Sequence, residues 1–286
     1  MDYGQVVANG LMIGAVYACI AVGFSLVWGV LNVINMMHGS FIMLGGYLTF
    51  FAWLHLKVSP IVSVVPVAAI LFVVGYLIQY LMINRVVMQP VLTTLTLTFG
   101  LDMILYNFMN LWFTATPRRV VLDLGRLDLG GVILPLDRVV AMGLALLLTG
   151  LLYTVMRTSR IGRAIVAVRM DRDAAALMGI RVNKVYAITF GIGALMAGAC
   201  GALVAVVFPI TTSVTGLFLG KAFVICVIGG LGSVPGALVG GLALGLIEAF
   251  AGFWFSPQTA ILAGFVIMLV LLVVRPTGLV GRRGYE

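Results

Sequence analysis

Four ionisable side chains interrupt the long apolar runs of this sequence, and their chemistry needs explaining first. His38 stands at the head of one run, Asp102 and Glu248 lie inside two others, and Lys221 lies near the start of a fourth. A charge in hydrocarbon costs on the order of 3 kcal/mol, so each side chain must face protein or water. Two interpretations stay open. They line a polar path across a membrane, or each makes one interhelical hydrogen bond or lies near the headgroups.

Glycines form a second pattern, downstream of Lys221. The cluster consists of Gly229, Gly230, Gly232, Gly236, Gly240, Gly241 and Gly245. Several pairs are four residues apart, the spacing that lets two helix backbones approach closely. Pro235 follows a Gly-Ser turn and is suited to begin a helix. A helix broken here would leave backbone groups free at membrane depth, which is tolerated only where they are buried in protein or line a cavity. Plain helix packing is the alternative.

Enzyme chemistry is not indicated. The sequence has no Gly-x-x-x-x-Gly-Lys-Ser/Thr phosphate loop and no serine elbow. His38 and His55 stand at opposite ends of one apolar run and cannot share a metal ion. The cysteines, Cys19, Cys200 and Cys226, have unrelated spacings and are predicted to be small packing residues. We therefore expect no catalytic residues, no metal and no cofactor on this chain.

The elements that must position these residues are membrane-spanning helices. Of 286 residues, 63% are hydrophobic and 9% are charged, and the mean hydropathy is +1.21, which excludes the soluble globular class. The apolar runs are near 20 residues long, so they predict helices and not barrel strands. The expected fold is an all-α polytopic integral membrane protein with a single transmembrane domain, 1–286, of eight to nine helices.

Nine candidate spans follow from the apolar runs. They are 5–31, 36–56, 60–83, 91–113, 136–156, 185–208, 217–231, 234–255 and 257–274. The first is too long for the apolar part of a signal peptide and is taken as a span. The seventh is short and ends in glycine, so a broken or re-entrant piece is an alternative there to a full crossing.

The distribution of lysine and arginine predicts the orientation. With nine crossings, one side receives eleven cations: Arg85, Arg157, Arg160, Arg163, Arg169, Arg172, Arg181, Lys184, Arg275, Arg282 and Arg283. The other side receives five, Lys57, Arg118, Arg119, Arg126 and Arg138, nearly balanced by Asp2, Asp123, Asp128 and Asp137. The positive-inside rule then places the N-terminus outside and the C-terminus inside. The net charge of +8 is therefore a topology signal, and no nucleic-acid partner is expected.

The stretch 157–184 is predicted to be a cytoplasmic loop with a short amphipathic helix. Apolar residues at helical spacing form one face, namely Ala167, Met170, Ala174, Leu177 and Met178, while Arg169, Arg172 and Asp173 fall on another. Gly179 is predicted to end the helix in the left-handed conformation, with Ile180 supplying the accompanying apolar contact. Such a helix docks on a partner protein or lies on lipid headgroups.

Four pieces of sequence, in order, resemble the permease subunit of bacterial branched-chain amino acid ABC importers, of the LivH type. They are Asn35-Met36-Met37-His38-Gly39; Gly162-Arg163-Ala164 through Leu177-Met178-Gly179-Ile180; Gly229-Gly230-Leu231-Gly232-Ser233-Val234-Pro235-Gly236-Ala237 through Glu248; and Pro276-Thr277-Gly278-Leu279. The chain differs from relatives at Met170, where glutamate is frequent, at Ser40, where an acidic residue is frequent, and at Asp102, where small polar residues are commoner.

The resemblance implies that 157–184 is the coupling loop, whose helix sits in a cleft of a cytoplasmic ATPase subunit. It implies a second homologous permease chain, two ATPase subunits that hold ATP and Mg²⁺, an extracytoplasmic binding protein, and the bacterial inner membrane. The residues expected to couple are Gly162, Arg163, Arg169, Met170, Arg172, Ala174, Leu177, Met178, Gly179 and Ile180. Those expected along the translocation path are Asn35, His38, Gly39, Ser40, Asp102, Lys221, Gly229, Gly230, Gly232 and Glu248.

Two alternatives to a branched-chain or other hydrophobic amino acid permease stay open at this point. Close relatives of the same type carry urea or short amides, so the cargo could be of that class. A proton-coupled secondary transporter would use Asp102 or Glu248 as its proton-linked site. It predicts uptake by this chain alone, whereas the ABC interpretation predicts none without ATPase partners.

Overall fold

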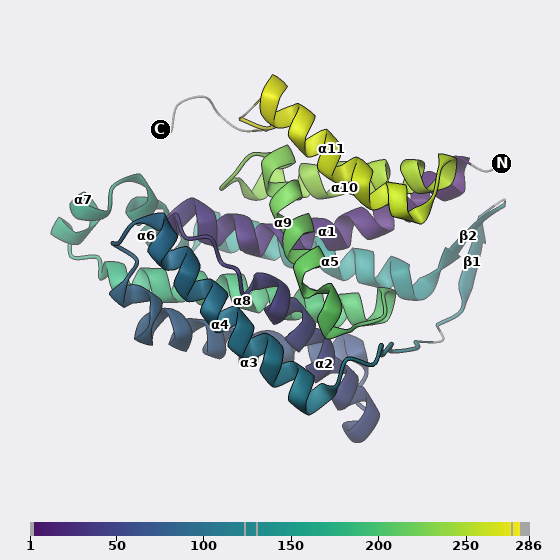
Figure 1. Cartoon of the computed structure of the whole chain (residues 1–286), viewed down its shortest axis with the longest axis horizontal. Coiled ribbons are helices and arrows are strands. Elements are labelled where there is room, and N and C mark those ends of the chain that lie inside the picture. The colour runs from purple at the N-terminus through teal and green to yellow at the C-terminus, as the bar shows by residue number, and fades with distance from the viewer. Residues whose placement is uncertain (1–2, 123, 130, 276, 281–286) are drawn as a thin grey trace.

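The chain folds into a bundle of helices (Figure 1). The computed structural model describes residues 3–122, 124–129, 131–275 and 277–280. In order, the elements are α1 (Tyr3–Leu31), α2 (His38–Leu56), α3 (Pro60–Leu81), the 3₁₀ turn η1 (Ile83–Arg85), α4 (Val91–Phe113), β1 (Arg126–Leu129), β2 (Val132–Pro135), α5 (Leu136–Thr158), α6 (Arg160–Met170), α7 (Arg172–Leu177), α8 (Val182–Val207), η2 (Thr212–Val214), α9 (Thr215–Gly229), α10 (Val234–Trp254) and α11 (Pro257–Val274). Within these described residues, nine helical segments are long and apolar enough to cross a membrane, which confirms the polytopic all-α prediction.

Helix ends follow the local sequence signals. The predicted spans begin and end within three residues of the helices. Ser233 caps α10, because its Oγ accepts a hydrogen bond from the Gly236 amide at 3.1 Å, and Pro235 occupies the first turn as expected. Ser256 and Thr259 form a reciprocal capping box at the start of α11.

The centre of the bundle is made by α1 and α8. The most apolar windows of both helices are 89% buried, whereas those of α4 and α11 are 17% buried. Small residues let the backbones meet. A Cβ added to Gly14 would lie 3.0 Å from the Gly241 carbonyl oxygen of α10, and one added to Gly23 would lie 2.9 Å from the Gly193 oxygen of α8. The outer helices are left to face lipid or other subunits.

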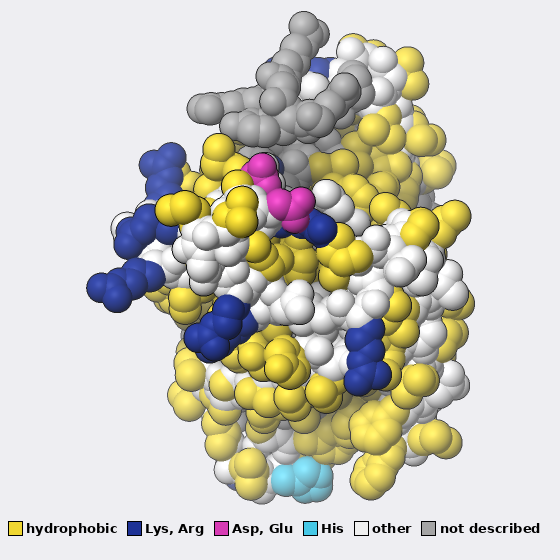
Figure 2. All heavy atoms as spheres, turned by 90° about the vertical axis from the view of Figure 1, so that its left-hand side faces the viewer, with side chains coloured by type: hydrophobic (Ala, Val, Ile, Leu, Met, Phe, Trp, Pro, Cys, Tyr) yellow, Lys and Arg dark blue, Asp and Glu magenta, His cyan; other side chains and the backbone are white. Residues whose placement is uncertain are grey.

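Contacts between distant segments define two ends of the bundle. At one end, Gln5 and Ile133 exchange two hydrogen bonds that tie the β1–β2 hairpin to the start of α1. At the other end, α6 approaches the α9–α10 turn, where Arg169 contacts Gly232, and α7 lies further out (Figure 1). These contacts agree with nine alternating crossings. Lys and Arg side chains spread over the α6–α7 end (Figure 2). Which end faces the cytoplasm stays a prediction.

The hairpin was not predicted. Residues 114–135 were expected only as an outer loop, but β1 and β2 pair antiparallel, with Leu127 opposite Leu134. A further isolated bridge joins Arg118 to Ile210, ahead of α9. Of the charges counted for orientation, Asp2, Asp123, Arg282 and Arg283 lie outside the described residues, as does Pro276 of the fourth matching piece.

Non-helical backbone penetrates the bundle in two places. After α1 the chain turns back, so that His38, the first residue of α2, bonds the Ile20 carbonyl near the middle of α1. Within this return, Val33, Asn35 and Met37 are buried. Before α9, Ile210 and Thr212 are also buried. The 15 residues of α9 measure about 22 Å, short of the roughly 30 Å hydrocarbon core, which fits the broken or re-entrant alternative for the seventh span. The return before α2 gives that helix the same character, because α2 also begins inside the bundle.

Candidate functional site

Lys221, Glu248 and Tyr17 join three helices in the apolar interior. Lys221 Nζ of α9 lies 2.8 Å from Glu248 Oε2 of α10, and the Tyr17 hydroxyl of α1 donates to the same oxygen at 2.8 Å. Lys221 also contacts the Tyr17 hydroxyl, and its ammonium lies 4.3 Å from that ring's centroid. The ion pair is almost fully buried, with 8% and 13% of the two side chains exposed. Lys221 therefore makes an interhelical contact, one of the alternatives that the sequence left open.

A second set of polar contacts joins α4 to the non-helical segment and first turn of α2 and to the non-helical segment before α9. Ser40 Oγ donates to Asp102 Oδ1 at 2.5 Å, linking the start of α2 to α4. One turn away, the Thr98 hydroxyl donates to the Ile34 carbonyl at 2.8 Å, so α4 satisfies a backbone acceptor of the chain return. Near the other end of α4, Thr212 donates to Asn110 at 2.5 Å. Thr98, Asn110, Thr212 and Tyr17 were missed. The available signal was the four-residue spacing of Thr94, Thr98 and Asp102 along α4, with Asn110 eight residues further on.

The Asn-x-x-His-Gly piece builds the entry to α2. Asn35 Oδ1 accepts from the Met37 amide at 3.1 Å and closes the turn ahead of the helix. His38 is fully buried, with its ring nitrogen Nε2 2.9 Å from the Ile20 oxygen and its ring edge-on to Phe24. Gly39 is required by a close approach, because a Cβ there would overlap the Thr215 carbonyl at the start of α9. The structure therefore brings the starts of α2 and α9 together.

The glycines at the α9–α10 turn bring two helices into backbone contact. A Cβ on Gly229 or on Gly236 would overlap the carbonyl of the other residue. Gly232 adopts a φ of +76°, which a residue with a side chain rarely tolerates. The C-terminal segment completes this hairpin, since the Leu279 amide donates to the Ile228 oxygen at 2.8 Å and the Val280 amide to the Gly229 oxygen at 3.2 Å. The turn is a tightly closed unit, and Gly230 lies inside it.

The charged loop contains two helices where one was predicted. Asp171 ends α6 and caps α7, its Oδ1 accepting from the Asp173 and Ala174 amides at 2.9 Å each. We call the resulting α6–α7 unit, Arg160–Leu177, the elbow. The predicted stop is confirmed: Gly179 has a φ of +82°, and the Ile180 amide donates to the Ala175 carbonyl at 3.1 Å in a Schellman arrangement.

The apolar stripe of the elbow is uncovered. The exposed fractions of Met170, Leu177 and Met178 are 73%, 89% and 83%, and Ala174 is exposed beside them. On the opposite side, Ala175 is buried. Gly162 lies against the end of α5, because a Cβ there would overlap the Met156 carbonyl, and Arg163 donates to the Thr158 carbonyl at 3.0 Å.

Two arginines connect the elbow to the membrane helices. Arg169 Nη1 donates to the Gly232 carbonyl at 2.9 Å and so reaches the α9–α10 turn. Arg172 pairs with Asp173 at 3.1 Å and contacts the sulfur of Met88, which precedes α4. The expected coupling residues and the expected path residues Gly229, Gly230 and Gly232 therefore meet, whereas Asp102 and Lys221 lie deeper in the bundle.

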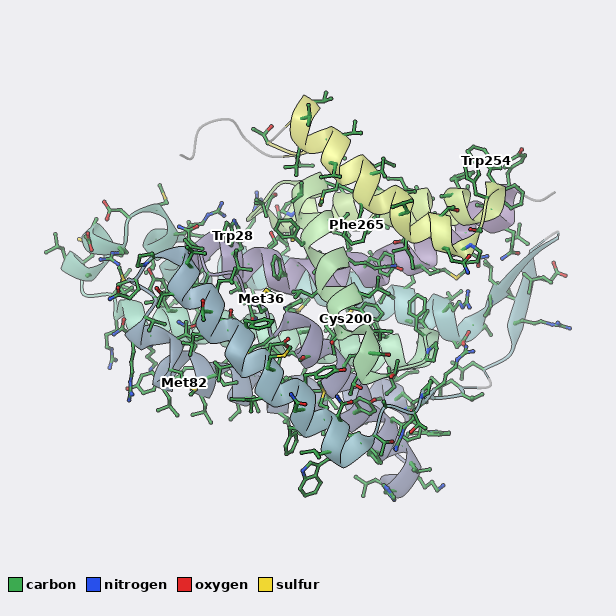
Figure 3. All side chains as sticks on the ribbon, viewed as in Figure 1. Trp28, Met36, Met82, Cys200, Trp254 and Phe265 are labelled. Carbon is green, nitrogen blue, oxygen red and sulfur yellow. The ribbon has the colours of Figure 1, made fainter. Side chains whose placement is uncertain are left out.

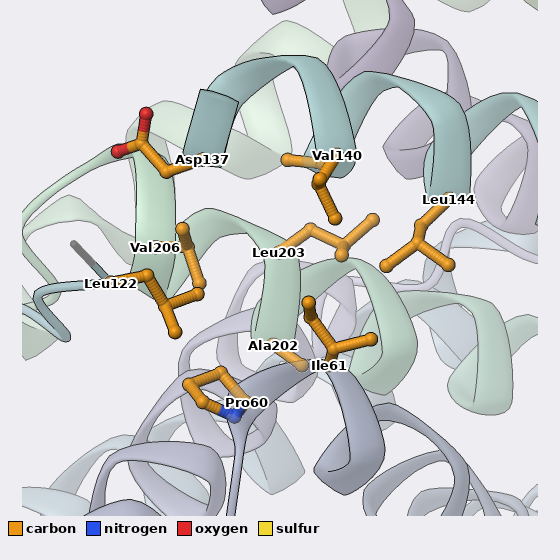
Figure 4. Close-up of a pocket in the computed structure, with 10 residues that line it drawn as sticks. Pro60, Ile61, Leu122, Asp137, Val140, Leu144, Ala202, Leu203 and Val206 are labelled. Atoms are coloured by element: carbon orange, nitrogen blue, oxygen red, sulfur yellow. The ribbon is translucent and has the colours of Figure 1, made fainter. Parts of the chain in front are cut away.

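Other chemistry-bearing groups have packing roles. Cys200 lies in the middle of the bundle, Trp254 towards the hairpin end, and Trp28 and Met82 towards the elbow end (Figure 3). The thiol of Cys200 is 3.3 Å from the Val16 carbonyl oxygen. A pocket between α3, α5 and α8 is lined by Pro60, Leu144 and Leu203 (Figure 4). Its volume of about 10 Å³ barely admits one water molecule, so it is a packing gap and not a cargo site.

Comparison with known proteins decides the family. The model of the family described as "Branched-chain amino acid transport system / permease component" matches residues 6–274. The chain belongs to this family. The permease is 32% identical over 304 residues to the high-affinity branched-chain amino acid transport system permease protein BraD of Pseudomonas aeruginosa, covering 99% of this chain and 97% of that one. It is 32% identical over 299 residues to LivH of Escherichia coli K12, covering 99% and 96%.

A solved structure, PsaBC from Streptococcus pneumoniae in complex with Fab, is more distant. It is 12% identical, with a TM-score of 0.49, and the alignment covers 96% of the permease and 92% of that chain. Family membership and the nine apolar helices together make this chain a multi-pass membrane transport component and not an enzyme.

Proposed function

We propose that the permease is the membrane subunit of an ATP-binding-cassette importer for branched-chain or other hydrophobic amino acids. The match to the family over residues 6–274 carries this proposal. The names of BraD and LivH support an amino-acid cargo over urea or short amides. The pairing of Glu248 with Lys221, and of Asp102 with Ser40, weighs against a free carboxylate that would serve a proton-coupled carrier.

The elbow is the part proposed to receive force from an ATPase. Three large apolar side chains stand uncovered on it, a composition suited to insertion in a groove. ATP and Mg²⁺ would be bound by the partner subunits and by none of this chain's residues. Movement of the elbow would reach the α9–α10 turn through the Arg169–Gly232 hydrogen bond, and α9 carries Lys221 and the contact with Gly39.

The remaining partners follow from what the bundle leaves exposed. The weakly buried faces of α4, α5 and α11 are proposed to contact a second, homologous permease chain and lipid. An extracytoplasmic binding protein would deliver cargo at the β1–β2 end, and the elbow would face the cytoplasm, in the plasma (inner) membrane of a bacterial cell. Residues 157–184 would then be the coupling loop of a single membrane domain.

Reconstitution tests the proposal. The tagged permease, copurified with its partners and placed in liposomes, should take up radiolabelled leucine only with ATP and the binding protein. Leu177→Asp should abolish ATPase copurification, because it puts a charge on the docking stripe. Ile161→Asp is the matched control, since Ile161 is 48% exposed on the elbow and outside the stripe. Uptake by the permease alone in a proton gradient, or equal copurification of both variants, would contradict the proposal.

A further inference from the structure

A cavity of about 310 Å³ lies between the elbow and the membrane helices. We call it the elbow cavity. One wall consists of elbow residues, and the other combines the end of α1, the segment before α4, the start of α4 and one residue of α8. The lining is Val30, Leu31, Asn32, Val87, Met88, Gln89, Val91, Thr94, Val168, Arg169, Met170, Asp171, Arg172 and Tyr186. Its volume is within the range of small-molecule sites, roughly 300–1,000 Å³.

The charges around the elbow cavity favour a carboxylate. Arg169 and Arg172 line it together with a single acid, Asp171. Asp171 is committed to capping α7. The Nε of Arg172 is paired with Asp173 at 3.1 Å, whereas its Nη1, among the hydrogen bonds of the described residues, has only the Met88 thioether as partner, and a thioether is a weak acceptor. A guanidinium in this situation is suited to a bidentate carboxylate, which would replace sulfur by two strong acceptors.

The rest of the lining favours a short aliphatic body. Val30, Leu31, Val87, Val91 and Val168 supply branched apolar side chains from both walls. Tyr186 and Thr94 add hydroxyl groups, and both residues are buried within the chain. A few polar groups set in an apolar wall are the usual composition of a site that orients a small ligand.

We propose that the elbow cavity binds a small aliphatic carboxylate on the cytoplasmic side, and that its occupancy slows uptake. The identity of that ligand as the imported amino acid, and the cytoplasmic location, rest on the proposed function. A bound molecule would touch the elbow and the membrane helices at once. It therefore favours the arrangement in which the two walls are close and opposes any arrangement that separates them. Accumulated cargo would thus restrain the element that drives further import.

Direct binding tests the site. Radiolabelled leucine is titrated onto the complete transporter, without binding protein, in nanodiscs. Arg172→Gln should weaken saturable binding at least tenfold, as should Val91→Phe, which fills the cavity without changing a charge. Arg181→Gln is the matched control, because Arg181 belongs to the same charged loop and does not line the cavity. Leucinamide, which lacks the carboxylate, should not compete.

Three results of this titration would overturn the site. These are unchanged binding in both Arg172→Gln and Val91→Phe, equal competition by leucinamide, and no saturable binding by the unmodified transporter. Nanodiscs of phosphatidylcholine and of phosphatidylglycerol separate a free carboxylate from a lipid phosphate. If leucine binding disappears in phosphatidylglycerol, the cavity is a lipid headgroup site and the proposal fails.

Uptake tests the regulation separately. Liposomes are preloaded with unlabelled leucine or left empty, and the initial rate of ATP-driven uptake is compared within each variant. Internal leucine should lower the rate several-fold in the unmodified transporter and in Arg181→Gln, and should leave Arg172→Gln and Val91→Phe unaffected. If uptake occurs but internal leucine slows all variants equally or none, only this inference fails. If empty liposomes show no uptake, the proposed function fails, and the titration still decides the site.

Discussion

The Lys221–Glu248 pair is a buried ion pair whose partners satisfy one another. Each charge is desolvated, and the Tyr17 hydroxyl donates to the shared carboxylate oxygen. A buried pair of this kind adds little net stability compared with apolar residues, but removal of one partner leaves an uncompensated charge. Such a group fixes the relative position of α1, α9 and α10, whether or not cargo passes near it.

Replacement of Lys221 alone should destabilise the permease, and replacement of both residues of the pair should restore most of the lost stability. Lys221→Met should lower the free energy of unfolding by about 3–5 kcal/mol, since Glu248 then stays buried without its cation. Lys221→Met combined with Glu248→Met should restore most of that loss. Thermal unfolding in detergent, followed by size-exclusion chromatography, measures both. A double variant no more stable than the single one would refute the structural role, and a stable double variant that no longer transports would indicate contact with cargo.

At the scale of elements, glycines let α9 and α10 pack so closely that we expect the two helices to move as one unit. The two helices meet backbone to backbone at Gly229 and Gly236, and Gly240 continues the contact, because a Cβ there would lie 2.5 Å from the Ile225 oxygen. A neighbouring face of α10 meets α1 at Gly241 and Gly245. Movement applied at Gly232 would therefore be passed to whole helices and not absorbed in a loop.

A side chain at the closest contact of this hairpin should separate it. Gly236→Leu should reduce folded yield and transport several-fold, because the added atoms have no space beside the Gly229 carbonyl. Gly143→Leu on α5 is the control, since nothing lies within 4 Å of a Cβ at that position. Yield and leucine uptake are compared for the two. Normal transport by Gly236→Leu would contradict the close-packing argument.

At the scale of the whole molecule, the two ends differ in charge and in structure. Among the described residues, the nine crossings assign nine lysines and arginines to the elbow end and five to the β1–β2 end. The three native cysteines are buried in the bundle, so we expect little reaction of their thiols with a labelling reagent. The positive-inside rule, applied to this arrangement, places the elbow in the cytoplasm.

Thiol accessibility checks that orientation. A cysteine at Leu127, 45% exposed on β1, should react with a membrane-impermeant maleimide in intact cells. A cysteine at Leu177, 89% exposed on the elbow, should react only after the membrane is opened. The reverse pattern would place the elbow outside and would remove the basis for ATPase coupling.

The sequence predicted the spans well, because a helix in lipid must be apolar over a fixed length and its ends carry local signals such as Ser233 and Pro235. Local signals did not reveal where His38 lies. Hydropathy marks a break between the first two spans, but it could not show that the segment from Asn32 to Met37 runs back to Ile20. The meeting of Lys221 with Glu248, and of Arg169 with Gly232, depends on how helices cross in three dimensions, which no periodicity encodes.

The segment after α11 donates hydrogen bonds to the last turn of α9. The carbonyls of Ile228 and Gly229 receive their donors from Leu279 and Val280, which emerge from the ribosome only after α10 and α11 have been made. A chain that lacks residues 279–280 would leave those two carbonyl oxygens without these amide donors. Closure of the α9–α10 turn therefore has to wait until residues 279–280 have been synthesised.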